Sequence, residues 1–286
     1  MHPLNCEDKF AALVRFARWQ CGSRLVSRSV VHEWVNKSRF FVKTGETGLT
    51  LNIYTGLHEF SDMGYLLHVL RSEDFFVDVG ANVGSYSILA GAAIGSRGIA
   101  FEPLPHTYMR LTENLRLNHL EERVISVNKG VGAEQGNIVF TSGKYDAMNH
   151  ALAENEQSEN TVNVEVTTLD ACLKTKSPSL IKIDVEGFET PVLEGADETL
   201  KKESLHSVIM ELNGSGSRYG YNESKILEKM QNHGFMTYSY DPLRRKLINL
   251  EGKNMTSGNT LFIRDKNFIE ERLRNAPKVK IHGREF

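Results

Sequence analysis

Residues 75–84 read Phe-Phe-Val-Asp-Val-Gly-Ala-Asn-Val-Gly, and this stretch decides the fold. Its apolar, β-branched first half predicts a buried strand that ends close to Asp78. Gly80 and Gly84 then bound a turn in which backbone and ligand can approach closely, and the helix expected to follow offers unpaired N–H groups. In an open α/β sheet, ligands bind at this edge. The stretch therefore predicts a ligand-binding turn.

Outward from this turn, strand and helix patterns alternate along the chain. The main strands are expected at 75–79, 98–101, 124–128, 180–183 and 207–210. Helices are expected at about 85–94, 105–118, 188–202 and 222–233. Other β segments are expected at 137–141, 162–167, 235–240 and 259–263, the last two as an antiparallel pair. The alternation predicts an α/β fold whose mostly parallel sheet has helices on both faces.

The chain divides into three expected regions. An N-terminal helical and β-hairpin extension (1–70) precedes the ligand-binding domain (71–264), and a basic C-terminal tail (265–286) follows. The extension is expected to hold amphipathic helices over 8–35 and a hairpin over 39–55. The apolar stripe of the helices suits a membrane surface or a partner, and it equally suits packing on the domain or a contact between copies of the chain.

The turn discriminates between three classes of cofactor. A dinucleotide enzyme would favour Gly-x-Gly-x-x-Gly, but Asn82 stands where the middle glycine would lie, which disfavours close passage of a pyrophosphate. A phosphate loop would need Gly-Lys-Ser/Thr, which this turn lacks. The third class binds S-adenosylmethionine, whose amino-acid part carries a cation that Asp78 could orient directly or through water.

A second carboxylate stands at the end of the next main strand. This strand ends at Glu102, which is followed by Pro103, and we count both as cofactor contacts. A carboxylate at this place can accept hydrogen bonds from both ribose hydroxyls of a nucleoside. The pair of Asp78 and Glu102 therefore favours a nucleoside cofactor.

Acidic residues also follow the fourth main strand. Residues 181–189 read Ile-Lys-Ile-Asp-Val-Glu-Gly-Phe-Glu. Asp184 is expected to face the pocket beside the transferable methyl group, and Glu186 lies one step further. These acids suit deprotonation of a hydroxyl nucleophile, or a hydrogen bond to it, and with Glu211 they could equally hold Mg²⁺. Glu186 and Glu189 could instead be helix N-terminal charges that stabilise the macrodipole.

Three further residues are candidates for the site. Two precede the domain, and the third lies in a polar stretch within it. His58 could act as a general base because an imidazole titrates near neutral pH, and Glu59 could reach the amino end of the cofactor. Either side chain could instead be structural. The polar stretch over 143–160 predicts a loop or mobile lid, in which Asn149 could line the cofactor or acceptor site.

Composition narrows the class of protein. The chain has 286 residues, of which 40% are hydrophobic and 24% charged, as in a globular protein. Its ends are basic, with balances of +4 over 1–40 and +3 over 264–286, while the whole chain carries −2. An acidic body argues against a nucleic-acid partner.

The sequence lacks an apolar run long enough for a transmembrane helix, and its three scattered cysteines suit a reducing compartment, so we expect a cytoplasmic protein.

These motifs resemble the FkbM family of S-adenosylmethionine-dependent methyltransferases, from about Gly45 to Ile263. The resemblance rests on the motifs at 76–86, 101–103, 168–170, 181–189 and 193–196. The last two are the most family-specific, whereas the glycine turn is shared by many methyltransferases. The resemblance implies a Rossmann-like class I methyltransferase fold with a seven-stranded sheet. The cofactor contacts that it implies are Asp78, Gly80, Asn82, Gly84, Glu102 and, by fold position alone, Val131.

The hypothesis from the sequence is an S-adenosylmethionine-dependent O-methyltransferase. Its acceptor would be a hydroxyl of a small molecule, a sugar or glycan, or a natural product. Asp184, with Glu186 or His58, would relieve that hydroxyl of its proton. The alternatives are an N-methyltransferase of a protein or small amine, a noncatalytic S-adenosylmethionine-binding module that docks through its basic ends, and a nicotinamide dehydrogenase. The N-terminal helices could also form a homo-oligomer.

Overall fold

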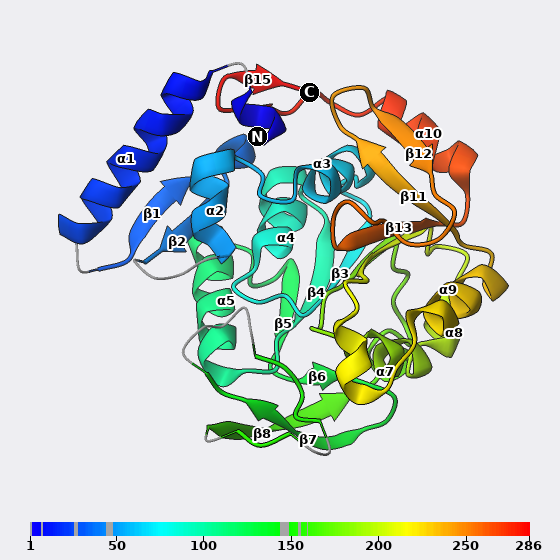
Figure 1. The fold of residues 1–286 in the computed structure, drawn as a ribbon. Helices are drawn as coiled ribbons and strands as arrows, with labels where there is room; N and C mark the ends of the chain where they lie inside the picture. The colour runs from blue at the N-terminus through cyan, green and yellow to red at the C-terminus, as the bar shows by residue number, and fades with distance from the viewer. Residues whose placement is uncertain are drawn as a thin grey trace.

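One eight-stranded sheet organises the chain. The structure is a computed structural model that describes residues 2–6, 8–25, 28–43, 48–143, 149–153, 156–158 and 160–286. The strand order is β12-β11-β13-β10-β9-β3-β4-β5 (Figure 1). The strands are β3 (Phe75–Val79), β4 (Arg97–Phe101), β5 (Val124–Val127), β9 (Leu180–Ile183), β10 (Ser207–Glu211), β11 (Met236–Asp241), β12 (Lys246–Asn249) and β13 (Asn259–Ile263).

The sheet confirms the expected fold class. Strands β5, β4, β3, β9 and β10 run parallel, and β13, β11 and β12 complete the sheet with antiparallel pairings. The sheet has one strand more than the seven that the family resemblance implies, because residues 246–249 pair with β11 as an edge strand.

The register brings the three predicted acidic sites to one edge of the sheet. Val79, the last residue of β3, pairs with Phe101 of β4 on one side and with Ile183 of β9 on the other. The residues that directly follow β4 and β9 are Glu102 and Asp184. Parallel pairing in this register therefore places both carboxylates beside the turn after β3, as the sequence predicts.

Helices cover both faces of the sheet, because successive side chains of each buried strand point to opposite sides. On β3 and β9, Phe76 and Leu180 belong to one core, whereas Val77 and Ile181 belong to the other. The first face is covered by α3 (Phe60–Val69), α4 (Ser85–Ile88), its π-helical continuation η3 (Leu89–Ile94), α5 (Pro105–Leu117) and α10 (Lys266–Arg274). The second is covered by α6 (Leu169–Cys172), α7 (Glu189–Glu194), α8 (Asp197–Lys201) and α9 (Glu223–Asn232).

The N-terminal extension differs from its prediction in two places. Its elements are η1 (Pro3–Asn5), α1 (Lys9–Leu25), β1 (Val30–Glu33), η2 (Val35–Lys37), β2 (Arg39–Val42) and α2 (Gly48–Thr55). The hairpin forms between β1 and β2, so the helix expected to reach residue 35 ends at Leu25. The expected second strand is α2, because Leu49, Asn52 and Ile53 are buried at a helical spacing. The expected turn at 45–48 lies largely outside the described residues.

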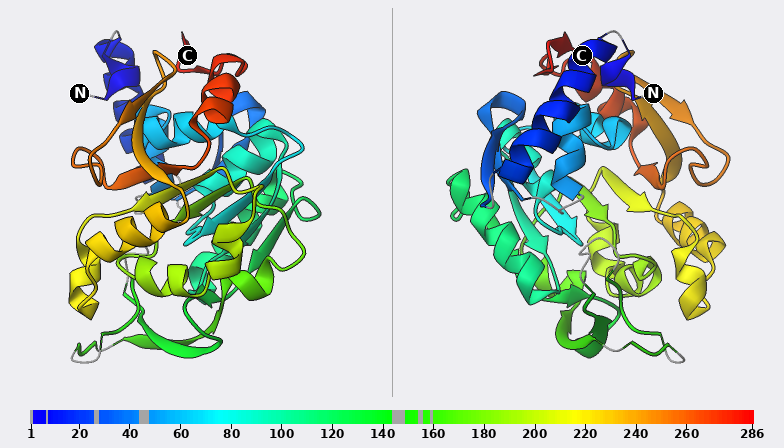
Figure 2. Two further views of the ribbon diagram at one scale, coloured as in Figure 1. Left: turned by 90° about the vertical axis from the view of Figure 1, so that its right-hand side faces the viewer. Right: turned by 60° about the vertical axis from the view of Figure 1, so that its left-hand side comes forward.

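The C-terminal residues form part of the core and are not a separate tail. After α10, β14 (Lys280–Ile281) and β15 (Arg284–Glu285) form a small hairpin. Ile269 and Leu273, one helical turn apart on α10, are fully buried, and the ring of Phe286 lies 5.2 Å from that of Phe60. These apolar side chains anchor the segment, so the boundary expected after residue 264 does not mark the end of the packed structure. The two ends of the chain lie side by side (Figures 1 and 2).

A small second sheet lies beside the end of β5. It consists of β6 (Gly130–Val131), β8 (Thr161–Thr167) and β7 (Gly136–Thr141) in that order, and η5 (Ser215–Tyr219) packs close by. The expected 143–160 loop lies partly outside the described residues, although Ala151 forms a bridge with Phe140. Among the described residues, every helix is too short or too polar to cross a bilayer.

Candidate active site

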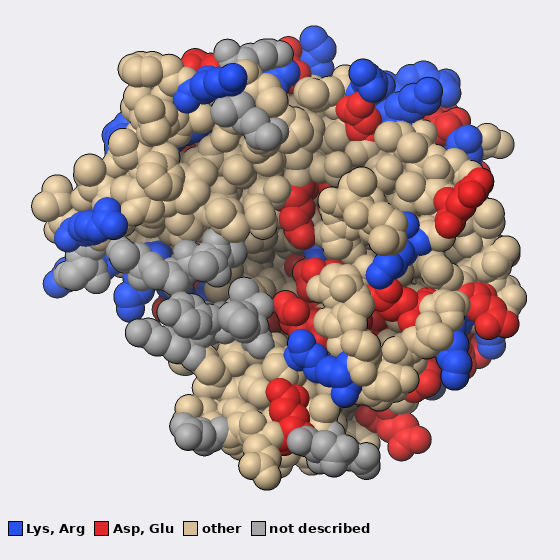
Figure 3. All heavy atoms as spheres, viewed as in Figure 1, with Lys and Arg blue, Asp and Glu red and all other residues tan. Residues whose placement is uncertain are grey.

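A cavity of about 250 Å³ opens at the carboxyl edge of β3, β4 and β9. Figure 3 shows acidic side chains gathered around a hollow in the middle of this face. The cavity brings together eleven residues that the sequence singled out: His58, Glu59, Asp78, Gly80, Asn82, Glu102, Pro103, Val131, Asn149, Asp184 and Glu186. Gly84 lies outside its lining.

The glycine turn is shaped by close backbone contacts. Gly80 has a φ of +77°, and a Cβ atom there would lie 1.8 Å from the carbonyl oxygen of Asp184. Only glycine fits between the ends of β3 and β9 in this conformation. Gly84 has a φ of +96°, and a Cβ atom there would meet the side chain of Leu111 at 2.7 Å. Gly84 therefore serves the packing of α4 against α5, and Gly80 serves the cavity.

Glu102 holds the other side of the turn. Its Oε2 accepts a hydrogen bond from the backbone N–H of Asn82 at 3.0 Å, and its Oε1 accepts one from the N–H of Leu104 at 2.9 Å. Asn82 has a φ of 50°, a conformation that asparagine tolerates better than most residues. Glu102 is thus fixed in the cavity wall where the sequence predicts a ribose contact.

Asp78 is a buried carboxylate beneath α4. It is 2% exposed, and its Oδ2 accepts a hydrogen bond from the hydroxyl of Ser87 at 2.6 Å. Burial raises the pKa of Asp78 to about 6, although the bond from Ser87 opposes this shift. Lys182 is the register partner of Asp78 on β9, so its ammonium group lies on the same face of the sheet.

Lys182 pairs with Asp184 inside the site. Its Nζ lies 2.7 Å from Oδ2 of Asp184 and 4.7 Å from the centre of the Tyr86 ring. Burial alone would lower the pKa of Lys182, but the charges of Asp184, Glu59 and Asp78 raise it overall, so the ammonium form is held. The Asp184 side chain is 30% exposed, whereas that of Lys182 is 3% exposed. Asp184 can therefore contact a ligand in the cavity, while the buried Lys182 pairs with the Asp184 carboxylate.

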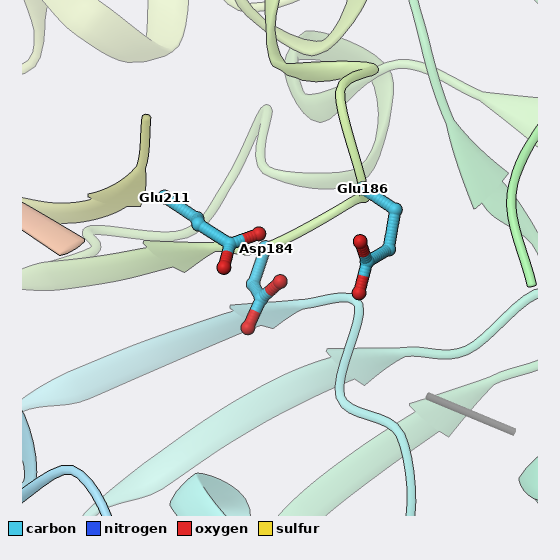
Figure 4. Close-up of side chains that lie close together, drawn as sticks. All are labelled: Asp184, Glu186 and Glu211. Carbon is cyan, nitrogen blue, oxygen red and sulfur yellow. The ribbon is translucent and has the colours of Figure 1, made fainter. Parts of the chain in front are cut away.

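Three carboxylates converge at this end of β9 and β10. Oxygen atoms of Asp184, Glu186 and Glu211 lie within 4.8 Å of one another (Figure 4). Burial, followed by the charge of Asp184, raises the pKa of Glu186 and raises that of Glu211 to about 9. Glu189 is separate from this group: its Oε1 accepts hydrogen bonds from the N–H groups of Val185 and Gly187 at 3.3 and 3.2 Å and so holds the turn.

Replacing Glu211 with Gln should flatten the dependence of stability on pH above neutrality. The unfolded chain ionises Glu211 near pH 4.5, whereas the folded chain keeps it protonated to about pH 9. The wild-type protein therefore loses stability as the pH rises between these values. At pH 8 we expect Glu211→Gln to be more stable by about 1 kcal/mol, allowing for partial solvent screening. Urea unfolding from pH 6 to 9 measures this difference.

Glu198→Gln is the matched control for this prediction. The Glu198 side chain is 74% exposed and pairs with Lys201 on the surface of α8. Its substitution should leave the pH curve unchanged, because an exposed pair contributes little to stability. Parallel curves for Glu211→Gln and the wild-type protein would show that Glu211 is ionised in the folded state.

A network of polar side chains around Glu59 forms one part of the cavity wall. Glu59 accepts hydrogen bonds from the hydroxyl of Tyr86 at 2.7 Å and from the amide of Asn259 at 2.8 Å. The same amide lies 3.3 Å from Oδ2 of Asp62, whose pKa burial raises to about 7. His58 is exposed at the rim, and its backbone N–H donates to Asn52 at 2.7 Å. Glu59 is thus an anchored wall residue, and His58 is a solvent-facing one.

Several site residues were not singled out from the sequence. Lys182 stands on β9, two positions before Asp184, and side chains two apart along an extended chain point to the same side. Ser87 lies nine residues after Asp78, and only its hydrogen bond to the Asp78 carboxylate reveals that it belongs to the site. Asn259 lies 200 residues from Glu59 in the sequence, so only the sheet order brings them together.

The fold and this edge define a class of protein. A mostly parallel sheet, a glycine turn after its central strand and carboxylates after the next strands form the Rossmann-like methyltransferase arrangement. The family model described as "Methyltransferase FkbM domain" matches residues 78–237, more than half of the chain. The protein belongs to this family, as the sequence motifs indicate.

The chain is also similar in sequence to methyltransferases from an archaeon and a fungus. The chain is 30% identical over 147 residues to hexuronic acid methyltransferase AglP of Haloferax volcanii, covering 51% of this chain and 59% of that protein. It is 28% identical over 176 residues to methyltransferase 1 of Beauveria bassiana, covering 54% and 70%. A solved FkbM methyltransferase from Methylobacillus flagellatus is 17% identical with a TM-score of 0.44, covering 68% of this chain and 44% of that one.

Proposed function

We propose that the protein transfers a methyl group from S-adenosylmethionine to a hydroxyl of a carbohydrate or a similar small molecule. One observation carries the proposal. The carboxylate of Asp184 is partly exposed in the cavity wall and is paired with the buried ammonium group of Lys182. Such a carboxylate is suited to accept a proton from a neutral oxygen nucleophile.

The cavity fits the cofactor through the chemistry of its wall. Asp78 would face the cationic amino-acid end, and Glu102 would face the ribose hydroxyls, while Gly80 leaves room for close approach of the backbone. Pro103 and Val131 add apolar surface beside Glu102. When bound, S-adenosylmethionine supplies a methyl group on a positively charged sulfur.

The protein's own part in the reaction is to orient the acceptor and to hold its proton. Asp184 would accept the proton from the acceptor hydroxyl, and the ion pair with Lys182 would hold the carboxylate of Asp184 in place. Lys182 also supplies a positive charge 2.7 Å from one of the three carboxylates, that of Asp184. The proposal therefore requires no Mg²⁺. Most of the rate acceleration would come from holding the cofactor and the acceptor hydroxyl close together in the reactive orientation.

An aromatic groove beside the cavity supports a sugar acceptor. Phe188 lines both the cavity and a neighbouring groove of about 840 Å³. In this groove, the rings of Tyr219 and Tyr221 lie 5.6 and 6.5 Å from that of Phe188. Aromatic surfaces bind the C–H faces of sugar rings, and Arg218 in the same wall suits an acidic sugar. The relative AglP is named for its action on a hexuronic acid.

Product analysis tests the proposal. The full chain is incubated with S-adenosylmethionine and glucuronic acid, glucose or glucosamine, with and without EDTA. We expect S-adenosylhomocysteine release and an added methyl group on a sugar oxygen, unaffected by EDTA. Methylation of the amino group would instead support the N-methyltransferase alternative. Cofactor binding without turnover on any acceptor, or turnover that needs added Mg²⁺ after EDTA, would contradict the proposed function or its metal-free mechanism.

A further inference from the structure

Helix α1 turns an apolar face toward solvent. Phe10, Leu13, Val14 and Leu25 are 76%, 62%, 46% and 86% exposed. Steps of three, four and eleven residues place them on one side of the helix. Seven of the fourteen large apolar side chains that are exposed among the described residues lie between positions 10 and 31. We call Phe10, Leu13, Val14 and Leu25 the α1 face.

The side of α1 that adjoins Leu13 holds the helix on the protein. The ring of Phe16 lies 5.1 Å from that of Tyr54 on α2, and Gln20 donates a hydrogen bond to the hydroxyl of Tyr54 at 2.8 Å. Ser23 on the same side is buried. Figures 1 and 2 show α1 at the outer edge of the molecule, alongside α2. The α1 face is therefore turned away from the domain by these contacts.

Positive charge surrounds the α1 face. Residues 9–32 contain five Lys or Arg residues and lack Asp and Glu. Four of these cations, Lys9, Arg18, Arg24 and Arg28, are exposed. A second copy of the chain would bring like charges together at this face, which opposes self-association. An apolar stripe flanked by Lys and Arg matches instead the surface of an anionic bilayer.

We propose that α1 docks the protein on the surface of an anionic membrane. The helix has 17 residues and carries several charges, so it would lie in the interface and would not span the bilayer. The α1 face would enter the boundary between headgroups and acyl chains, while the flanking cations would meet the lipid phosphates. Val30 and Val31, on β1 after the helix, are also exposed.

Vesicle sedimentation tests this docking independently of methyl transfer. The full chain is mixed with vesicles of phosphatidylcholine alone or of phosphatidylcholine with phosphatidylglycerol. We expect binding to the anionic vesicles that weakens as salt is added. The triple variant Phe10→Ser, Leu13→Ser and Leu25→Ser should lower the partition coefficient at least about tenfold, because each change removes apolar surface from the bilayer.

A matched control separates this effect from general surface hydrophobicity. Met109 and Met255 are 55% and 82% exposed and lie far from α1 in the sequence. Met109→Ser with Met255→Ser should bind vesicles as the wild-type protein does. Wild-type protein that stays in the supernatant, or a triple variant that binds equally well, would overturn the proposal. So would a dimer in sedimentation velocity that the triple variant dissociates, since a second copy would then cover the α1 face.

Discussion

An Asp184→Asn variant should lose about 10²- to 10³-fold in kcat while its affinity for S-adenosylmethionine stays within about threefold. The substitution keeps the shape of the side chain but removes the carboxylate that lies 2.7 Å from Lys182. The acceptor hydroxyl would then lack a proton acceptor in the transition state. Single-turnover kinetics and calorimetry on the same preparation measure the two quantities separately.

Lys182 variants distinguish a catalytic role of Asp184 from a structural one. Lys182→Met removes the ammonium group that lies 2.7 Å from Asp184, so kcat should fall while cofactor affinity changes little, whereas Lys182→Arg should largely restore kcat. Equal loss of turnover and cofactor affinity in Asp184→Asn would make Asp184 a cofactor residue. Unchanged turnover would indicate an acceptor oxygen that is already ionised, such as the carboxylate of a sugar acid.

The edge of the sheet is predictable because short-range patterns determine it. Asp78, Glu102 and Asp184 each stand at or next to the end of a mainly apolar strand, and parallel strands bring their carboxyl ends to one edge. A glycine with no room for a side chain marks the turn between them. These signals lie within ten residues of each strand, so a single sequence contains them.

Contacts between distant segments are not predictable in this way. The carboxylate of Glu59 is anchored by Asn259, which belongs to the antiparallel part of the sheet. Residues 49–53 have an alternating apolar pattern typical of a strand, yet burial of Leu49, Asn52 and Ile53 against the core selects a helix. The apolar residues of 265–286 are few, and only their partners on α3 show that the segment is packed.

An Asp78→Asn variant should bind S-adenosylmethionine about 10²-fold more weakly, or not measurably, in calorimetry. Asparagine can still accept the hydrogen bond from Ser87, so the fold of the turn is preserved, but the buried charge opposite a cationic ligand is lost. The loss should appear in cofactor affinity, with α4 and the surrounding core still folded by thermal melting.

The pH dependence of cofactor binding tests whether the lost charge of Asp78 causes the lower affinity of Asp78→Asn. Because burial raises its pKa to about 6, a proton competes with the cationic cofactor below that pH, and wild-type affinity should fall as the pH drops from 7 to 5. The affinity of Asp78→Asn should vary little over this range. Asp74→Asn is the control, since Asp74 is also buried but pairs with Arg272 and lies outside the cavity lining. If Asp78→Asn keeps its affinity, or if its affinity retains the wild-type slope with pH, the cofactor's positive end lies elsewhere in the cavity.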